Sequence, residues 1–244
     1  TCITFDDGLK SQLNSLKDLN KYSIKAFFFI NTEFIGSKKV SPEAIRFFIY
    51  NYCKGIKKFY KIFIHNCNFD FQKILKNNKK KINFYKSKYK FYNMEDIKFR
   101  VIRNKISQKK YFSIMKKIMK IKNFKYNKLK FELYFSKKDL IKIDKDGHLI
   151  GLHTHSHPGD FSILNLKDQK KELSLNIKYL KKILKDKKRV FKSFSYPGGN
   201  YSKETLKLLK NSSIKIAFTN STQLVSNSIL EIPRINHKYL LRFL

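Results

Sequence analysis

Apolar and polar positions separate two short strands from one helix in the first thirty residues. Residues 2–5 form a strand-like run, and leucines then recur at helical spacing up to about residue 22. Residues 26–30 are uniformly apolar and predict a second buried strand. A helix between two such strands is typical of a βαβ unit, in which a parallel sheet is covered on both faces. The pattern therefore predicts an α/β fold.

The same alternation returns after residue 135. Turn residues separate its segments, and Ser202 is placed to cap a helix. The second half therefore continues the architecture that the first thirty residues begin. In chain order, the pattern predicts a helix over 136–145, a strand over 148–152, a helix over 167–185, a strand over 190–196, a helix over 203–210 and a strand over 214–219.

Between these two parts the texture of the sequence changes. Residues 36–130 are rich in Lys, Phe, Tyr, Ile and Asn, contain very little Gly or Pro, and carry no chemical motif. We interpret them as a mainly helical insertion. Two roles fit it: a cap over one edge of the sheet, or a partner-binding face. The remaining residues, 1–35 and 131–244, would then form one discontinuous domain.

Two segments inside the insertion carry specific expectations. An amphipathic pattern predicts a helix over about 108–122, with Met115 and Met119 in the core and not in a binding groove. The segment that carries His65 and Cys67 is predicted to be a packed strand. We therefore interpret the closeness of these two residues in the sequence as incidental and not as a catalytic pair.

The chain is strongly basic, because 54 Lys and Arg residues stand against 18 Asp and Glu residues, a formal net charge of +36. Such a balance raises nucleic acid, anionic membranes and acidic polymers as partners. Only six of the cations are arginines, the residue type that binds phosphates and bases through paired hydrogen bonds. We interpret most lysines as belonging to solvated faces and expect no nucleic acid as partner. A polyanion-binding protein remains an alternative.

The sequence carries no signal for a membrane span, for a disulfide framework or for a particular cellular location. The longest apolar run, residues 26–30, is far shorter than the roughly 20 residues that cross a bilayer, so no transmembrane segment is predicted. Residue 1 already lies in a strand-like run, and we expect the natural chain to begin upstream, which leaves localisation open between cytoplasm and cell envelope. Three cysteines, at positions 2, 53 and 67, indicate neither a disulfide framework nor a zinc cage.

Three polar clusters follow directly after predicted strands. They are residues 6–8 (Asp-Asp-Gly), 153–157 (His-Thr-His-Ser-His) and 196–199 (Tyr-Pro-Gly-Gly). In a parallel α/β fold the carboxyl ends of the strands face one edge, where ligands bind. The clusters are therefore expected to meet in space.

The adjacent carboxylates Asp6 and Asp7 are costly to ionise side by side unless a cation or a proton is shared between them. A metal ion removes that cost, since one carboxylate can bind the ion while the other accepts a proton. The same three residues are also common in ordinary turns, so this reading needs a second set of ligands.

His153 and His157 supply such a set. They are four residues apart, a spacing that suits a divalent ion, and Pro158 favours a turn and not a helix at this point. His155 is expected to point elsewhere. One Asp and two His leave coordination positions open for water and substrate, which is the pattern of a catalytic site. The implied chemistry is hydrolysis, with an activated water and a free carboxylate as base.

The sequence resembles the polysaccharide deacetylases, the NodB homology domain of carbohydrate esterase family 4. Residues 4–8 (TFDDG) and 153–158 (HTHSHP) are similar to the first two motifs of that family. Residues 194–199 (FSYPGG) fall where the third motif is expected. Similar segments also surround the second strand, at 21–29, and precede the histidines, at 146–151.

The resemblance implies a distorted, incomplete (β/α) barrel and a hydrolase that removes acetyl groups from N-acetylated sugars with zinc or a similar divalent ion. By position, Asp6 would be the general base, and the metal ligands would be Asp7, His153 and His157. A backbone N–H at Gly198 would bind the oxyanion.

Two departures from the family pattern stand in the second half. The family commonly carries an arginine in the third motif that contacts the catalytic aspartate, and Ser195 occupies that position here. Arg234 is our candidate substitute, the alternative being a surface arginine. The late motifs are not clearly present, and His237, the only late histidine, is assigned the acid role against the alternative of an exposed bystander. A catalytically inactive carbohydrate-binding relative therefore also remains an alternative.

Overall fold

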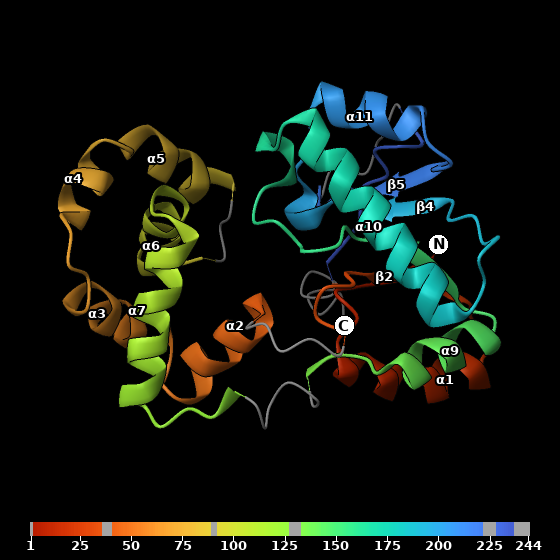
Figure 1. Cartoon of the computed structure of the whole chain (residues 1–244), viewed down its shortest axis with the longest axis horizontal. Coiled ribbons are helices and arrows are strands. Elements are labelled where there is room, and N and C mark those ends of the chain that lie inside the picture. The colour runs from red at the N-terminus through yellow and green to blue at the C-terminus, as the bar shows by residue number, and fades with distance from the viewer. Residues whose placement is uncertain (1, 36–40, 89–91, 127–132, 222–227, 237–244) are drawn as a thin grey trace. The chain divides into compact units, whose positions relative to one another are not determined.

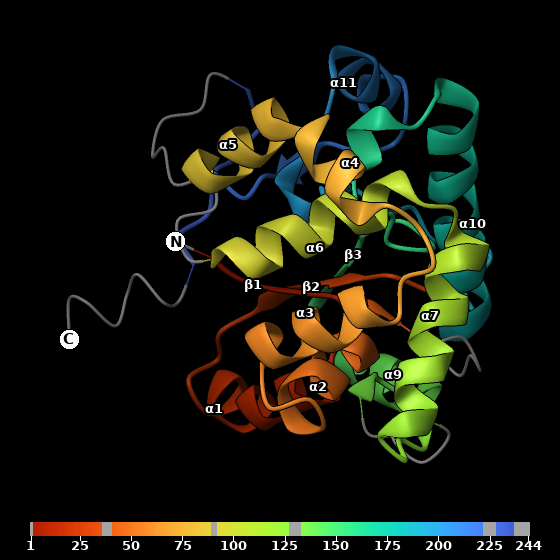
Figure 2. The ribbon, with the colours of Figure 1, turned by 90° about the vertical axis from the view of Figure 1, so that its left-hand side faces the viewer.

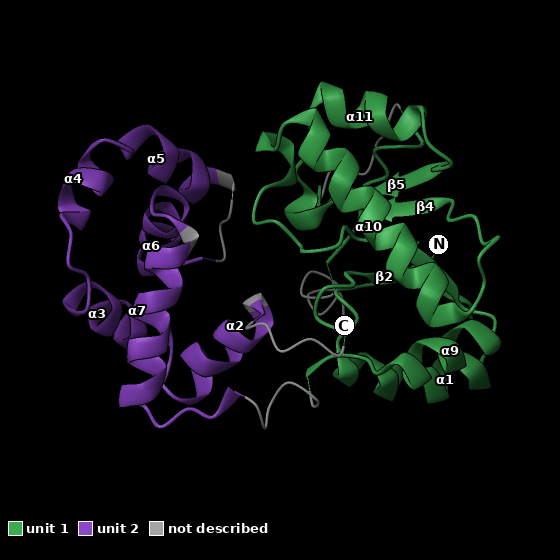
Figure 3. Cartoon of the chain, in the orientation of Figure 1, with its two compact units in different colours: residues 1–39, 130–244 green, residues 40–129 purple. Residues whose placement is uncertain are grey.

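The chain divides into two compact units (Figure 3). In this computed structural model the described residues are 2–35, 41–88, 92–126, 133–221 and 228–236. The first unit comprises residues 1–39 and 130–244, and the second comprises residues 40–129. The sequence led us to expect 1–35 with 131–244, and 36–130.

Within the described residues of the first unit, five parallel strands form one sheet in the order β1-β2-β3-β4-β5. The strands follow one another in the chain with helices between them, and five is fewer than the eight of a closed barrel. This confirms the predicted α/β class and the incomplete (β/α) barrel. The strands are β1 (Ile3–Asp6), β2 (Ala26–Ile30), β3 (Leu149–Leu152), β4 (Ser193–Ser195) and β5 (Ile216–Phe218).

Helices cover this sheet, with α11 above it and α1 and α9 below it in Figures 1 and 2. The helices of this unit are α1 (Leu16–Lys21), α9 (Lys137–Lys145), α10 (Leu166–Leu184) and α11 (Lys203–Lys210). Short 3-10 turns are η1 (Lys10–Ser15), η2 (Phe161–Ile163) and η3 (Pro197–Gly199).

Two predicted elements are shorter or less regular than expected. The helix predicted up to residue 22 begins as the 3-10 turn η1, because the Gln12 amide donates to the Asp6 carbonyl and its oxygen accepts from the Leu9 N–H. The strand predicted over 190–196 pairs only over 193–195, and Val190 is exposed. An apolar run indicates burial, whereas the sheet ladder depends on where the neighbouring strand ends.

The core of the first unit lies between the sheet and its helices. Fully buried side chains from both layers meet there, including Phe28, Phe194 and Leu180. Gly151 in β3 permits close approach, since a Cβ at this position would lie 2.4 Å from the Phe29 ring and 2.6 Å from Ser193 Oγ. The strands that carry the polar clusters are therefore held by a densely packed interior.

The second unit is helical throughout its described elements, which confirms the mainly helical insertion. Helix α7 matches the prediction over 108–122, and Met115 and Met119 are buried in the core of this unit. The helices are α2 (Pro42–Asn51), α3 (Ile56–His65), α4 (Phe71–Lys76), α5 (Lys79–Lys88), α6 (Met94–Lys105) and α7 (Gln108–Ile121).

The strand expected around His65 and Cys67 is wrong, because this segment forms helix α3 and its C-terminal turn. The buried residues of α3 are Ile56, Phe59, Tyr60 and Phe63, which follow the spacing of three to four residues of a helical face. Across the described ranges, no helix is both long enough and apolar enough to span a lipid bilayer.

Candidate active site

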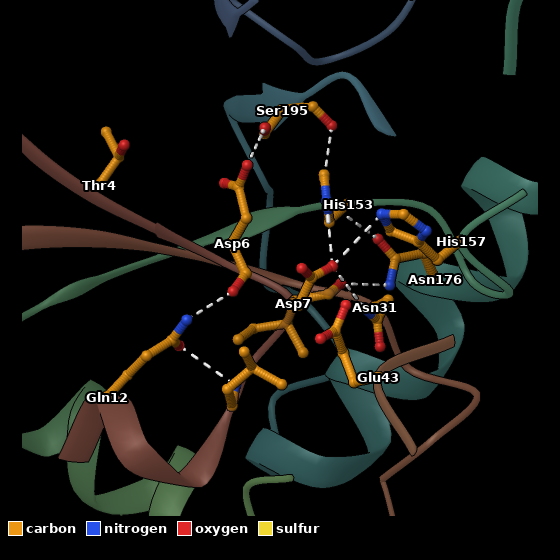
Figure 4. Close-up of polar contacts among 12 residues, drawn as sticks. Thr4, Asp6, Asp7, Gln12, Asn31, Glu43, His153, His157, Asn176 and Ser195 are labelled. Carbon is orange, nitrogen blue, oxygen red and sulfur yellow. Dashed lines mark hydrogen bonds and ion pairs between the residues drawn. The ribbon is translucent and has the colours of Figure 1, made fainter. Parts of the chain in front are cut away.

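Residues of the first two polar clusters gather with Ser195, which precedes the third, at one edge of the sheet, as Figure 4 shows. Asp6 is the last residue of β1, His153 follows the last residue of β3, and Ser195 is the last residue of β4. Because these strands are parallel, their carboxyl ends face the same side. The topology thus brings together side chains that are far apart in the sequence, such as Asp6 and Ser195, which are separated by 189 positions.

Asp7 is the centre of a cluster that could hold a metal ion. The Nε2 atoms of His153 and His157 lie 3.4 Å and 3.3 Å from Asp7 Oδ1. One ligand atom from each of the three residues lies within 4.8 Å of the others. Asn31, which follows β2, donates from Nδ2 to Asp7 Oδ1 at 3.1 Å and orients this carboxylate.

The hydrogen bond of His153 decides which of its nitrogens faces Asp7. Its Nδ1 lies 2.7 Å from the carbonyl oxygen of Ser195, and a carbonyl can only accept. Nδ1 therefore carries the hydrogen, and Nε2 faces the carboxylate oxygen. A neutral ring would place a lone pair against that negative oxygen, so the contact requires a proton or a cation between the two atoms.

The charges of this cluster favour a bound cation. Burial opposes protonation of His153, but the carboxylates of Asp6 and Asp7 and the Ser195 carbonyl outweigh it and raise its pKa. Burial lowers the pKa of His157, which keeps this imidazole neutral and able to act as a ligand. One carboxylate and two imidazoles are donors that zinc and similar divalent ions bind, so the residues fit such an ion.

Three residues of the site adopt left-handed backbone. The φ angles are 74° at Asp7, 63° at Thr154 and 49° at His157. Such angles are uncommon for residues other than glycine and cost of order 1–3 kcal/mol each. His157 therefore lies in a turn and not in a helix, and the surrounding contacts must hold the loop in place.

Asp6 is bound by the guanidinium of Arg234. Arg234 donates from Nη1 to Asp6 Oδ1 at 2.8 Å and from Nη2 to Oδ2 at 2.7 Å. Its Nε donates to the Thr219 carbonyl at 2.9 Å, which orients the guanidinium plane. Ser195 Oγ donates to Asp6 Oδ2 at 3.1 Å and accepts from Arg234 Nη2 at 3.0 Å.

The environment of Asp6 favours its ionised form. Burial would raise the pKa of this carboxyl, but the charges of His153 and Arg234 and the Arg234 hydrogen bonds lower it below its usual value. Asp6 therefore remains a carboxylate that can accept a proton. The family resemblance led us to expect that Arg234 replaces the arginine for which Ser195 stands in this chain. The structure does place Arg234 against Asp6.

The other predicted site residues stand as follows. Gly198 lies in η3, directly after β4, with a left-handed φ of 63°. His155 turns away from Asp7, since its Nδ1 lies 2.8 Å from Thr32 Oγ1 and its ring stacks on Tyr179. His237 lies outside the described residues. The oxyanion role of Gly198 and the acid role of His237 stay predictions.

Sequence reasoning missed three polar residues around the site, Asn31, Glu172 and Asn176. Asn176 is fully buried on the same face of α10 as Leu173 and Leu180. Its Oδ1 accepts from the His153 N–H at 3.0 Å. An amide on the apolar stripe of an amphipathic helix was the available signal, because buried polar groups need partners.

Comparison with known proteins now places the chain in a family. The sequence model of the family described as polysaccharide deacetylase matches residues 71–217. The chain therefore belongs to the polysaccharide deacetylase family. No curated protein matches the sequence at a significant level.

Solved structures share the fold at low sequence identity. The Streptococcus pyogenes deacetylase PplD in complex with acetate is 15% identical, with a TM-score of 0.51 over 99% of this chain and 68% of that one. IcaB from Ammonifex degensii is 14% identical, with a TM-score of 0.50 over 96% and 66%. The BpsB deacetylase domain from Bordetella bronchiseptica is 11% identical, with a TM-score of 0.51 over 96% and 69%. The chain spans about two thirds of each of these structures.

Proposed function

We propose that this protein is a metal-dependent deacetylase that hydrolyses the acetamide group of an N-acetylated carbohydrate. The observation that carries the proposal is the pairing of two groups at one sheet edge. Asp7, His153 and His157 offer three convergent ligand atoms, and the neighbouring Asp6 carboxylate is bound by Arg234. Membership of the polysaccharide deacetylase family supports the choice of substrate and reaction.

The reaction joins the oxygen of a water to the carbonyl carbon of the acetamide and breaks the carbon–nitrogen bond, which yields acetate and a free amine. A divalent ion at Asp7, His153 and His157 would lower the pKa of a water and polarise the acetamide carbonyl. Zinc is our first choice, because one carboxylate and two imidazoles are ligands common in catalytic zinc sites.

The chain itself supplies the proton transfers and the charge stabilisation. Asp6 accepts the proton of the attacking water, and its lowered pKa keeps it ionised for that step. The Gly198 N–H donates to the oxygen that becomes negative in the transition state. The imidazole of His237 returns a proton to the departing nitrogen.

Metal content and acetate release test this proposal directly. The protein is depleted of metal with a chelator, and acetate release from N-acetylglucosamine oligomers is measured before and after zinc is restored. We expect loss of activity on depletion and recovery with about one zinc ion per chain. Acetate release that is indifferent to depletion would overturn the metal dependence. Zinc binding without acetate release from any of several N-acetylated sugars would identify an inactive carbohydrate-binding relative.

Replacing Arg234 by glutamine is expected to move the acid limb of the kcat/KM profile to higher pH. Arg234 stabilises the ionised form of Asp6, so its removal raises the pKa of this base, and activity is then lost at a higher pH as pH falls. A neighbouring opposite charge shifts a carboxyl pKa by about 1–3 units, which sets the expected displacement. The measurement is kcat/KM for acetate release from about pH 3 to 9, a range that extends below the usual pKa of an aspartate.

Arg189 provides a matched control for this variant. It makes the same two-bond contact with Asp144, at 2.7 Å and 3.1 Å. Arg189 precedes β4 and so lies at the sheet edge opposite to the carboxyl ends. Arg189→Gln should lower stability without moving the acid limb. Equal profiles for wild type and Arg234→Gln would contradict the assignment of Arg234 to the base.

A further inference from the structure

The loop between the two histidine ligands is held in a costly conformation. Thr154 and His157 both adopt left-handed φ angles, of 63° and 49°. Two such residues within four positions store backbone strain, so contacts from outside the loop must stabilise it.

Glu172 supplies three of these contacts from helix α10. Its Oε2 accepts from the N–H groups of His155 at 2.9 Å and of Ser156 at 2.8 Å. Its Oε1 accepts from Ser156 Oγ at 2.7 Å. All three donors lie between Thr154 and His157, the two residues with left-handed backbone. Hydrogen bonds to an ionised acceptor are short and roughly twice as strong as neutral ones.

Asn176, one helical turn further along α10, fixes the start of the loop, and Figure 4 draws it beside both histidines. Its Oδ1 accepts from the His153 N–H at 3.0 Å, and its Nδ2 donates to the Ile30 carbonyl at 2.9 Å. Asn176 therefore also joins β2 to β3 and serves the fold as well as the site. Among the described residues, the Glu172 carboxylate forms hydrogen bonds only with this loop, so its effect on the site can be separated from folding.

We propose that Glu172 is a positioning residue that fixes the backbone between His153 and His157 and thereby sets the direction of the His157 imidazole toward Asp7. This inference rests on the proposed function, because it concerns the same ion site. Helix α10 thus affects the ion site indirectly, because one of its carboxylates holds the loop that carries a ligand. A carboxylate is required because all three partners are donors.

Glu172→Gln tests the proposal, because the amide keeps the shape but replaces one acceptor by a donor. The first readout is the affinity of the metal-free protein for zinc alone, measured by competition with a chromophoric chelator. We expect binding about tenfold to a hundredfold weaker, the usual effect of losing a group that orients a ligand. The second is the absorption spectrum of the cobalt-substituted protein, which should change in intensity. The third is amide hydrogen exchange at His155 and Ser156 without metal, which should accelerate.

Two further variants separate positioning from folding. Asp18→Asn removes one carboxylate from the exposed surface of α1 and should leave all three readouts unchanged. Ser156→Ala removes one of the three bonds to Glu172, and we expect a weakening of zinc binding of a few fold. It remains informative if Glu172→Gln does not fold.

The outcomes distinguish this inference from the proposed function. Wild-type zinc affinity and cobalt spectrum in Glu172→Gln, with or without a lower melting temperature, would overturn the positioning role while wild-type activity stands. Failure of the wild type to bind zinc would overturn the proposed function and this inference together. Weaker zinc binding in Glu172→Gln, with normal binding in Asp18→Asn, is the expected result.

Discussion

Replacing Asp7 by asparagine is expected to abolish acetate release and to weaken zinc binding by more than about 100-fold, the upper end of effects for groups that only orient a ligand. The physical reason is the position of one atom. Asp7 Oδ1 is the oxygen on which the Nε2 atoms of His153 and His157 converge, at 3.4 Å and 3.3 Å. Asparagine keeps the shape of the side chain but removes the charge that offsets a divalent cation.

The measurement for Asp7→Asn combines a zinc titration with acetate release from N-acetylglucosamine oligomers. Circular dichroism should remain unchanged, because Asp7 lies in a turn after β1 and not in the packed interior. Asp18→Asn again serves as the control for loss of one negative charge. Activity that survives in Asp7→Asn would remove the metal mechanism, whatever the zinc affinity.

Asp6→Asn should separate proton transfer from metal binding. We expect zinc affinity close to that of the wild type, because the ligand cluster comprises Asp7, His153 and His157. We expect kcat to fall by about 10²–10⁴-fold, the range typical for loss of a general base. The amide cannot accept the proton of the attacking water, and Arg234 then faces a neutral partner.

The pH dependence gives a second test of Asp6. In the wild type, burial raises the pKa of Asp6, but neighbouring positive charge and the hydrogen bonds of Arg234 lower it below its usual value, so the base stays active until the pH falls through that lowered value. The residual activity of Asp6→Asn should lack this acid limb. An unchanged profile with a reduced rate would assign the limb to another group and contradict the base role.

Much of the fold followed from local pattern. The alternation of apolar strands with amphipathic helices predicted the parallel sheet, and α10 and α11 agree with their predicted ranges to within one residue. Ser202 caps α11 as expected, accepting from the Thr205 N–H. Local hydrogen bonds and burial of one face determine these elements. Both can be predicted from one sequence, through its capping residues and the spacing of its apolar residues. The strand prediction around His65 was wrong, because the buried residues of α3 follow a helical period.

The candidate site was predictable where its residues are close in sequence or follow strand ends. Asp6 and Asp7 lie next to each other, and His153 and His157 are four residues apart after an apolar strand. Arg234 was found through a resemblance, by asking what could replace an absent cation. Glu172 and Asn176 were not found, because their partners are backbone groups of a loop whose path the sequence does not state.

The sequence by itself determined the order of strands and helices, the types of ligand available and the chemistry that they allow. The tertiary structure decided which side chains meet. Arg234 contacts Asp6 across 228 positions, and Ser195 joins both through its hydroxyl group. The physical reason is that periodicity encodes which face of an element is buried. Contacts between distant residues depend instead on strand register and loop path, which the packing of the whole unit sets.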